Sequence, residues 1–203
     1  MGGVRESISE KLVGVWQRES ICIGDGEPYE DSRVLWLQTP YLYADMRVPL
    51  SGEKVGKESF AGDQLWVDPS LTFNHELDFA GTYSQDIGLL TWDGETLVES
   101  GSVPYKDDVI HYVERWQRCS PINVISNAWE VRDSDEVLQA LALVVDNFAM
   151  LVTNLSEFGA VLFENNSSVW KKTTQVGVEV ECIPPWKLEV FTGSIELDWR
   201  QVK

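Results

Sequence analysis

Apolar and polar residues alternate along most of this chain, with the period of two that marks strands with one buried face. Two alternating segments, 34–38 and 42–48, flank Thr39-Pro40, which predicts a β-hairpin. Asp93-Gly94 predicts a second tight turn between the strands on either side of it. In the first 120 residues the pattern also predicts strands at 65–67, 73–79, 87–92, 96–100 and 109–118, and a Gly-, Lys- and Glu-rich loop at 49–63.

The second half of the chain continues the alternation. Residues 138–145 are long enough for a helix, but Leu141, Leu143 and Val145 alternate with their neighbours, which favours a strand. The other strands expected here lie at 128–132, 149–153, 160–164, 169–174, 176–182, 187–191 and 194–201. Near the N-terminus, Ser7 followed by Glu10 has the spacing of a capping box, which predicts a short helix at 7–12.

Many short strands with so little helix predict an all-β fold, in which sheets close into barrels or pack as sandwiches. Ser120-Pro121 interrupts the pattern, so we expect two consecutive antiparallel β-barrels, residues 1–120 and a smaller one at 121–203. Trp16-Gln17-Arg18 recurs as Trp116-Gln117-Arg118. This echo suggests that two barrel units close in a similar way.

The charge balance excludes several classes of partner. The chain has 33 Asp and Glu against 16 Lys and Arg, a formal net charge of −17. Nucleic-acid binders neutralise phosphates with clustered basic residues, so neither nucleic acid nor an anionic membrane surface is an expected partner. The longest apolar run, 137–152, contains Gln139, Asp146 and Asn147, and it is too short and too polar to span a bilayer.

The cysteines and histidines predict no metal site. Cys22, Cys119 and Cys182 are widely spaced and odd in number, so we expect unpaired thiols in a reducing compartment. Only two histidines could complete a ligand set, which argues against structural zinc. The first residues contain no apolar segment of the kind that a secretory signal needs. We therefore expect a cytoplasmic protein without a metal or cofactor.

Gly14-Val15-Trp16, at the start of the first strand, resembles the Gly-x-Trp motif that opens lipocalin-like (calycin) barrels. In that family an Arg from the last strand covers the face of the Trp, a cation–π contact worth roughly 0.5–2 kcal/mol. The resemblance implies that Arg115 or Arg118 has this role in the first barrel. It implies the same role for Arg200 in the second.

A longer resemblance is to the small fungal family of two-barrel β proteins named for an interaction with a casein kinase. It rests on matches in the same order over most of the chain: Trp36-Leu37, Tyr41-Leu42-Tyr43, Val48-Pro49, Val98 to Val103, Glu114 to Gln117 and Leu197-Asp198-Trp199. The resemblance implies two lipocalin-like barrels and an interaction with a partner protein. It implies no catalytic residue. Because the sequence also lacks a nucleophile-elbow or nucleotide-binding motif, we expect no enzyme.

Four residues are candidate ligand contacts inside the first barrel: Trp36, Tyr43, Arg47 and His75. His75 shares an alternating apolar face within 73–79, either as a core histidine bonded to a neighbour or as a contact for a small ligand or a haem iron. Trp36 lies in the neighbouring hairpin. Tyr43 and Arg47 share a face with Asp45, which is either an outer polar face or the wall of a polar cavity.

Two functions fit this architecture. The first is a non-enzymatic lipocalin-like protein that holds a small apolar or amphipathic ligand in the first barrel. The alternative is a protein–protein interaction module, whose barrels are filled by their own side chains and whose surface docks a partner. Cavity volume separates the two, because pockets for small molecules measure roughly 300–1,000 Å³.

Overall fold

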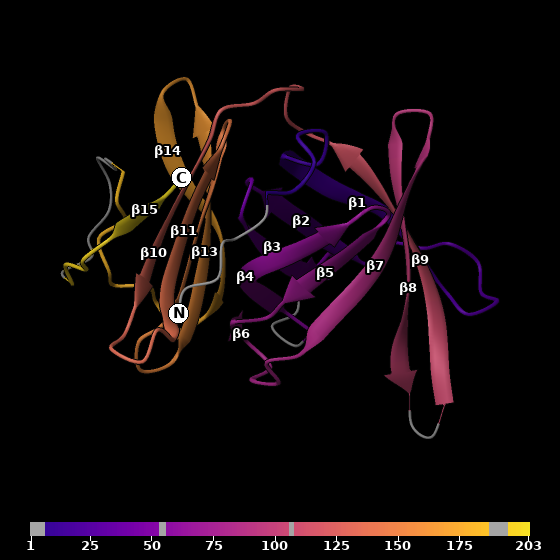
Figure 1. Cartoon of the computed structure of the whole chain (residues 1–203), viewed down its shortest axis with the longest axis horizontal. Coiled ribbons are helices and arrows are strands. Elements are labelled where there is room, and N and C mark those ends of the chain that lie inside the picture. Colours follow the sequence, from indigo (N-terminus) through magenta and orange to yellow (C-terminus); the bar gives the residue numbers. More distant parts are fainter. Residues whose placement is uncertain (1–6, 53–55, 106–107, 187–194) are drawn as a thin grey trace.

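The structure, a computed structural model, describes residues 7–52, 56–105, 108–186 and 195–203. Strands joined by turns and loops make up these residues (Figure 1), and no helix among them is long and apolar enough to cross a membrane. The all-β fold class is therefore confirmed. The strands are β1 (Gly14–Ile23), β2 (Ser32–Gln38), β3 (Leu42–Pro49), β4 (Glu58–Val67), β5 (Ser70–Asn74), β6 (Leu77–Asp78), β7 (Gln85–Asp93), β8 (Thr96–Tyr105), β9 (Asp108–Arg118), β10 (Ser126–Arg132), β11 (Leu138–Val145), β12 (Phe148–Asn154), β13 (Phe158–Asn166), β14 (Val169–Gly177) and β15 (Arg200–Val202).

Eight strands of the first half close into an antiparallel barrel. Neighbours in the ring follow the chain in the order β1-β2-β3-β4-β5-β7-β8-β9, and β9 pairs back with β1. The two-residue strand β6 pairs with β4 beside this ring. Closure satisfies the backbone groups of every strand in the ring, so this half of the protein offers no long open sheet edge.

The strands that close the barrel carry the repeated Trp-Gln-Arg string. Trp16 lies opposite Arg118, and Arg18 lies opposite Trp116, across the β1–β9 ladder. The two copies of the string therefore face each other within one barrel and do not mark two barrel units.

A cation–π contact closes one end of the barrel, and it involves one of the two arginines that the Gly-x-Trp motif suggested. The Arg118 guanidinium carbon lies 4.2 Å from the centre of the Trp16 ring. Arg118 Nη1 also donates to the Val13 carbonyl at 2.8 Å. Arg115 points elsewhere and pairs with Asp93 at 2.7 Å.

Strands β10 to β15 form a six-stranded sheet in the order β14-β13-β12-β11-β10-β15. Its edge strands do not pair with each other in the described residues, so the expected second barrel is wrong and this half is an open sheet. Val180, Cys182 and Trp199, from the C-terminal segment, cover the sheet face turned away from the barrel. Arg200 bonds Glu130 instead of covering a Trp ring. The division into domains 1–120 and 121–203 stays a prediction.

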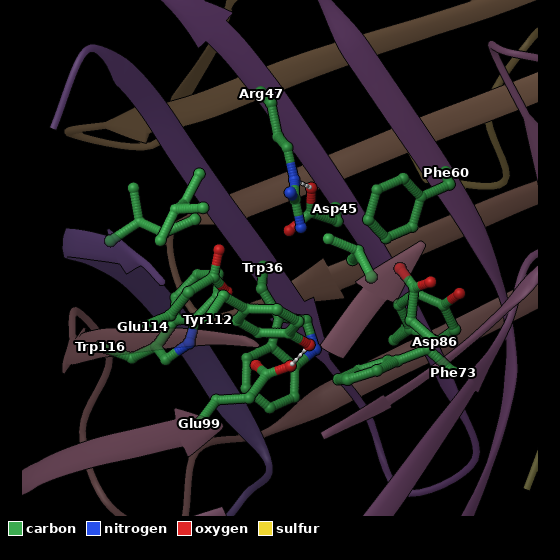
Figure 2. A pocket seen from close by; sticks show the side chains of 14 residues that line it. Trp36, Asp45, Arg47, Phe60, Phe73, Asp86, Glu99, Tyr112, Glu114 and Trp116 are labelled. Carbon is green, nitrogen blue, oxygen red and sulfur yellow. Dashed lines mark hydrogen bonds and ion pairs between the residues drawn. The ribbon is translucent and has the colours of Figure 1, made fainter. Parts of the chain in front are cut away.

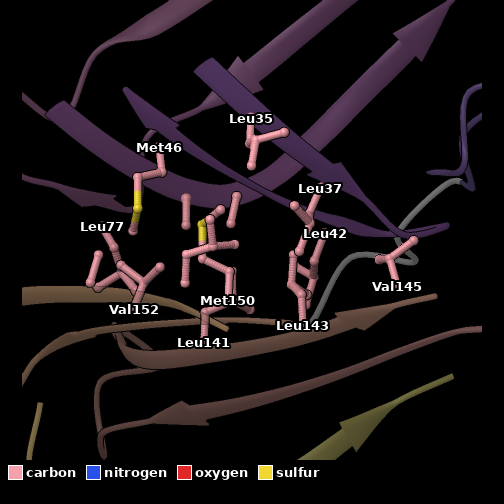
Figure 3. Close-up of a cluster of buried hydrophobic side chains, with 14 of the residues drawn as sticks. Leu35, Leu37, Leu42, Met46, Leu77, Leu141, Leu143, Val145, Met150 and Val152 are labelled. Atoms are coloured by element: carbon pink, nitrogen blue, oxygen red, sulfur yellow. The ribbon is translucent and has the colours of Figure 1, made fainter. Parts of the chain in front are cut away.

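A layer of buried apolar side chains joins the outer wall of the barrel to the second sheet (Figure 3), and we call it the central layer. From the barrel it contains Val15, Leu35, Leu37, Leu42, Ala44, Met46, Ala61 and Leu77, and from the sheet Ala128, Leu138, Leu141, Leu143, Val145, Met150, Val152, Ala160, Leu162 and Val176. Each of these residues is at most 4% exposed. Burial of this much apolar surface is the dominant favourable term for joining the two halves.

Where the central layer covers the barrel, the apolar side chains of the wall point outward and polar side chains point into the barrel. On β3 the even-numbered residues 42–46 lie in the central layer. The intervening Tyr43, Asp45 and Arg47 line the barrel interior. Of the two interpretations of this polar face, the cavity wall is therefore the observed one.

Two predicted segments of the first half are wrong. The expected loop at 49–63 includes the start of β4, and the expected strand at 73–79 is broken between β5 and β6. The Asp78 carboxylate accepts backbone N–H bonds from Ala80, Thr82 and Tyr83, which form a turn in place of a strand. Leu77 packs in the central layer between the barrel and the second sheet, whereas His75 stacks on Phe60, so the two side chains do not share a face.

In the second half, β11 has the bounds predicted for it, whereas the segments after it differ. The expected strand at 176–182 is absent because β14 ends at Gly177, whose φ of +73° turns the chain. Of the expected strand at 194–201, only β15 forms. The strand expected at 187–191 lies outside the described residues.

The expected short helix at 7–12 does not form, and this segment contains only a turn. The Leu12 N–H donates to the Ser9 carbonyl at 2.8 Å, and no further helical bond follows. Side chains donate hydrogen bonds to backbone carbonyls that would accept from the next turn of a longer helix. Trp16 Nε1 donates to the Leu12 carbonyl, and Arg118 donates to the Lys11 carbonyl. One turn without continuation cannot offset the cost of helix nucleation.

The central layer predicts the cost of truncating one of its members. Leu141→Ala should lower the free energy of unfolding by about 2–5 kcal/mol, because Leu141 is fully buried and the change leaves a cavity. Urea denaturation followed by tryptophan fluorescence measures this change. Val137→Ala, at a neighbouring position that is 53% exposed, is the control and should change stability by less than about 0.5 kcal/mol. Equal effects would contradict the packing.

The contact between Trp16 and Arg118 predicts an energetic coupling. Trp16→Ala should destabilise by about 3–5 kcal/mol. In a double-mutant cycle, Arg118→Ala should be non-additive with it by about 0.5–2 kcal/mol. The same cycle with Arg115→Ala is the control and should be close to additive. Additivity for Arg118 would refute the cation–π closure.

Candidate functional site

An aromatic cluster fills one end of the barrel interior, and we call it the aromatic plug: Trp16, Trp36, Tyr43, Phe73 and Trp116. Trp36 is at its centre. The centroid of its ring lies 6.0 Å from that of Trp16, 5.7 Å from that of Trp116 and 5.4 Å from that of Phe73. Four of the five side chains are no more than 2% exposed, and Phe73 is 7% exposed. Such edge and offset contacts add to the energy of apolar burial and leave little space.

Beyond the plug, several polar side chains line a cavity of about 120 Å³, which is partly open to solvent near Ile23 and Val103 (Figure 2). Trp36 and Trp116 form its wall on the plug side. Arg47 enters from β3, Glu99 from β8 and Glu114 from β9. We call this space the polar cavity.

Arg47, whose side chain is half-buried, and the buried Asp45 form an ion pair at the cavity wall. Arg47 Nε lies 2.8 Å from Asp45 Oδ1, and its guanidinium carbon lies 5.0 Å from the centre of the Phe60 ring. Burial raises the pKa of Asp45, although the charge of Arg47 opposes that shift. Each member of this pair thus keeps a partner that offsets part of its desolvation.

Arg18 forms a second buried set of charges. Its Nη1 lies 2.5 Å from Glu114 Oε1, and its Nε lies 2.8 Å from Glu30 Oε2. Burial lowers the pKa of Arg18, but the hydrogen bond to Glu30 and the charge of Glu114 outweigh burial and raise it. The carboxylate of Glu114 is therefore compensated by a cation.

Glu99 has no such compensation. Its side chain accepts a hydrogen bond from the Tyr112 hydroxyl at 3.1 Å, and in the described part of the chain no basic side chain forms an ion pair with it. Burial first, and then the charge of Glu114, raise the pKa of Glu99 to about 8. Gly88 leaves room for the carboxylate, because a Cβ there would lie 2.5 Å from Glu99 Oε1.

A protein-family model matches most of the chain. The family model described as Protein HRI1 matches residues 14–198, which include all strands of the barrel and most of the second sheet. The chain belongs to the HRI1 family. Searches of curated proteins and of solved structures gave no match to it. The lipocalin relationship and the kinase interaction of this HRI1-family chain stay predictions.

The structure brings three of the four candidate ligand contacts of this HRI1-family chain to one place. Trp36, Tyr43 and Arg47 all line the polar cavity. His75 is buried behind the cavity wall, where its ring stacks on Phe60 at 4.0 Å with an interplanar angle of 10°. Ligand binding by these residues stays a prediction.

His75 reaches the cavity only through its neighbours. Its Nε2 lies 3.3 Å from Asp86 Oδ2, and its Nδ1 lies 3.4 Å from Ser84 Oγ. The contact with His75 lowers the pKa of Asp86, which itself lines the polar cavity. This arrangement is that of a core histidine with polar neighbours.

Sequence reasoning missed Glu99, Glu114 and Arg18. The sequence could have identified two of them. Glu114 lies two residues from Trp116 on β9, and Arg18 lies two residues from Trp16 on β1. Residues two apart on a strand share a face, so a buried Trp places its neighbour at i±2 in the interior as well. Glu99 required the register between β8 and β9, which places it opposite Glu114.

The raised pKa of Glu99 predicts how stability depends on pH. Glu99 keeps its proton in the folded protein up to about pH 8, whereas the unfolded chain releases it near the ordinary value of 4.5. Stability should therefore fall between these limits by up to about 1.4 kcal/mol per pH unit. Glu99→Gln should remove this contribution, and urea denaturation at several pH values measures it. A pH dependence unchanged by Glu99→Gln would contradict the assignment.

Proposed function

We propose that this protein is a non-enzymatic interaction module, built on a lipocalin-like barrel, that docks a basic partner protein. The observation that carries the proposal is the contrast between a filled interior and an exposed apolar outer wall. The aromatic plug and the buried ion pairs leave about 120 Å³ inside the barrel. This volume is below the roughly 300–1,000 Å³ of pockets that hold drug-sized ligands, which argues against a carrier of large apolar molecules.

The outer wall of the barrel away from the second sheet exposes apolar side chains on three strands. We call this surface the docking face: Leu65, Val67, Ile87, Leu89 and Val113, each 41–61% exposed. Val67, Leu89 and Val113 lie in one cross-strand row, with serines between them. Leu65 and Ile87 lie in the next row. Exposed apolar side chains that gather on one face in this way are typical of interaction surfaces.

The charge of the chain indicates what kind of protein fits this face. At a net charge of −17, a second copy would be repelled, whereas a basic surface would be attracted and steered to the barrel. Arg115, which borders the docking face, is already paired with Asp93. A partner with basic side chains around an apolar contact is therefore the complementary surface.

A casein kinase is the first partner to test, because the motifs of the sequence resemble a family named for that interaction. We also propose a cytoplasmic location, which is supported by the cysteines. Cys22, Cys119 and Cys182 are all unpaired. Unpaired thiols are typical of a reducing compartment.

The docking face predicts which substitutions weaken the complex. Ile87→Ser together with Leu89→Ser should weaken binding to a purified casein kinase by about tenfold or more, since both side chains lose apolar contacts. Calorimetric titration measures the affinity, which should also fall with rising ionic strength.

The matched control is Ile122→Ser with Ile125→Ser, at positions 73% and 83% exposed and outside the docking face. This variant should bind as the unchanged protein does. Absence of binding, or equal loss in both double variants, contradicts the proposal. Saturable binding of an apolar fluorescent probe that quenches tryptophan emission would favour the ligand carrier instead.

A further inference from the structure

Four carboxylates line the polar cavity: Asp45, Asp86, Glu99 and Glu114. Asp45 is paired with Arg47, Glu114 is paired with Arg18, and Asp86 lies 3.3 Å from His75 Nε2. Glu99, 5% exposed, accepts a bond from the neutral Tyr112 hydroxyl instead. A buried carboxylate without a cation either stays protonated or attracts a cation from outside.

A second polar group at the cavity wall is also without a partner. Trp116 Nε1 is buried, and no hydrogen-bond acceptor for it is found among the described residues. The Trp116 side chain is 2% exposed and lines the cavity together with Glu99 (Figure 2). Because buried polar groups in native proteins are nearly always satisfied, this donor indicates that the cavity holds a hydrogen-bond acceptor, such as a water molecule.

The rest of the wall suits a cation with a short apolar chain. The indoles of Trp36 and Trp116 line the cavity, and aromatic rings of this kind attract cations. Ile21, Ile23 and Val103 add apolar surface to the lining. A volume of about 120 Å³ exceeds the roughly 15 Å³ that one water needs, and it is too small for a drug-sized ligand.

Two other occupants fit less well. An anion would meet the carboxylates of Asp45, Asp86, Glu99 and Glu114, while Arg47, the arginine in the lining, is already paired with Asp45. A metal ion needs several ligands at once, and in the part of the chain that the structure describes no three His, Cys, Asp or Glu residues are arranged to hold one.

We propose that the polar cavity binds a primary ammonium group on a short aliphatic chain, held by the Glu99 carboxylate between the aromatic walls. The apolar chain contacts Ile21, Ile23 and Val103. A water molecule that accompanies the ammonium satisfies the Trp116 N–H. The same chemistry comes from a free alkylamine or from the lysine side chain of a docked protein. The site lies inside the barrel, so it goes beyond the docking face on the outer wall.

Calorimetric titration with n-butylamine hydrochloride tests the site. At about pH 9 most of the Glu99 carboxyl is ionised, while an alkylamine with a pKa near that of lysine, about 10.4, stays charged. Butylammonium should bind saturably, whereas n-butanol, with the same chain and no charge, should not. Glu99→Gln should weaken butylammonium binding by about tenfold or more, because it removes a charge-assisted hydrogen bond.

The matched control is Glu95→Gln, at an exposed position in the turn between β7 and β8, which should leave the affinity unchanged. Glu99→Gln removes a buried charge, so this variant should remain folded, and its urea midpoint verifies that. Equal binding of butanol and butylammonium, no binding of either, or full affinity in Glu99→Gln would overturn the proposal.

A second titration separates the two sources of the ammonium. Nα-acetyl-lysine N-methylamide presents a lysine side chain on a blocked backbone. If it binds as tightly as butylammonium, the cavity accepts the lysine of a partner; if only butylammonium binds, the ligand is a free amine. Neither titration contains a partner protein, so failure here leaves the docking face of the proposed function untouched.

Discussion

The central layer is the constraint on which the rest of the structure depends. Side chains of a strand alternate between its two faces, so a strand that gives its apolar residues to one side has only the others for the opposite side. On β3 the layer takes Leu42, Ala44 and Met46, and the barrel interior receives Tyr43 and Arg47. The second sheet is therefore the reason that a small barrel can have charged groups inside.

That inversion places several charges in a space shielded from water. Pairing offsets most of their desolvation, and removal of one partner from a buried pair typically costs about 3–5 kcal/mol. The pairs of Arg47 with Asp45 and of Arg18 with Glu114 follow this rule. Glu99 does not, and its raised pKa is the electrostatic consequence. Groups of this kind cluster at functional sites more often than elsewhere.

The barrel wall has two apolar outer faces, and only one is covered by the protein itself. The central layer covers the face formed by β2, β3 and part of β4, whereas Ile87 and Leu89 on β7 remain exposed. Closure of the ring through β1 and β9 removes the sheet edges that could otherwise recruit a partner strand. Binding of another protein to the barrel would therefore use side chains of the docking face rather than strand addition.

The sequence by itself determined the all-β class, strand 138–145 and the role of Gly14-Val15-Trp16, because local alternation and a short motif encode them. It also marked Trp36, Tyr43 and Arg47 as candidates. Only the tertiary structure decided which face of each strand is inside, since alternation shows two faces but not what covers them. For the same reason the sequence did not identify Glu99 as an interior residue. It also did not show that the strings around Trp16 and Trp116 pair within one barrel, or that the second half forms an open sheet. Each of these depends on contacts between segments far apart in the chain.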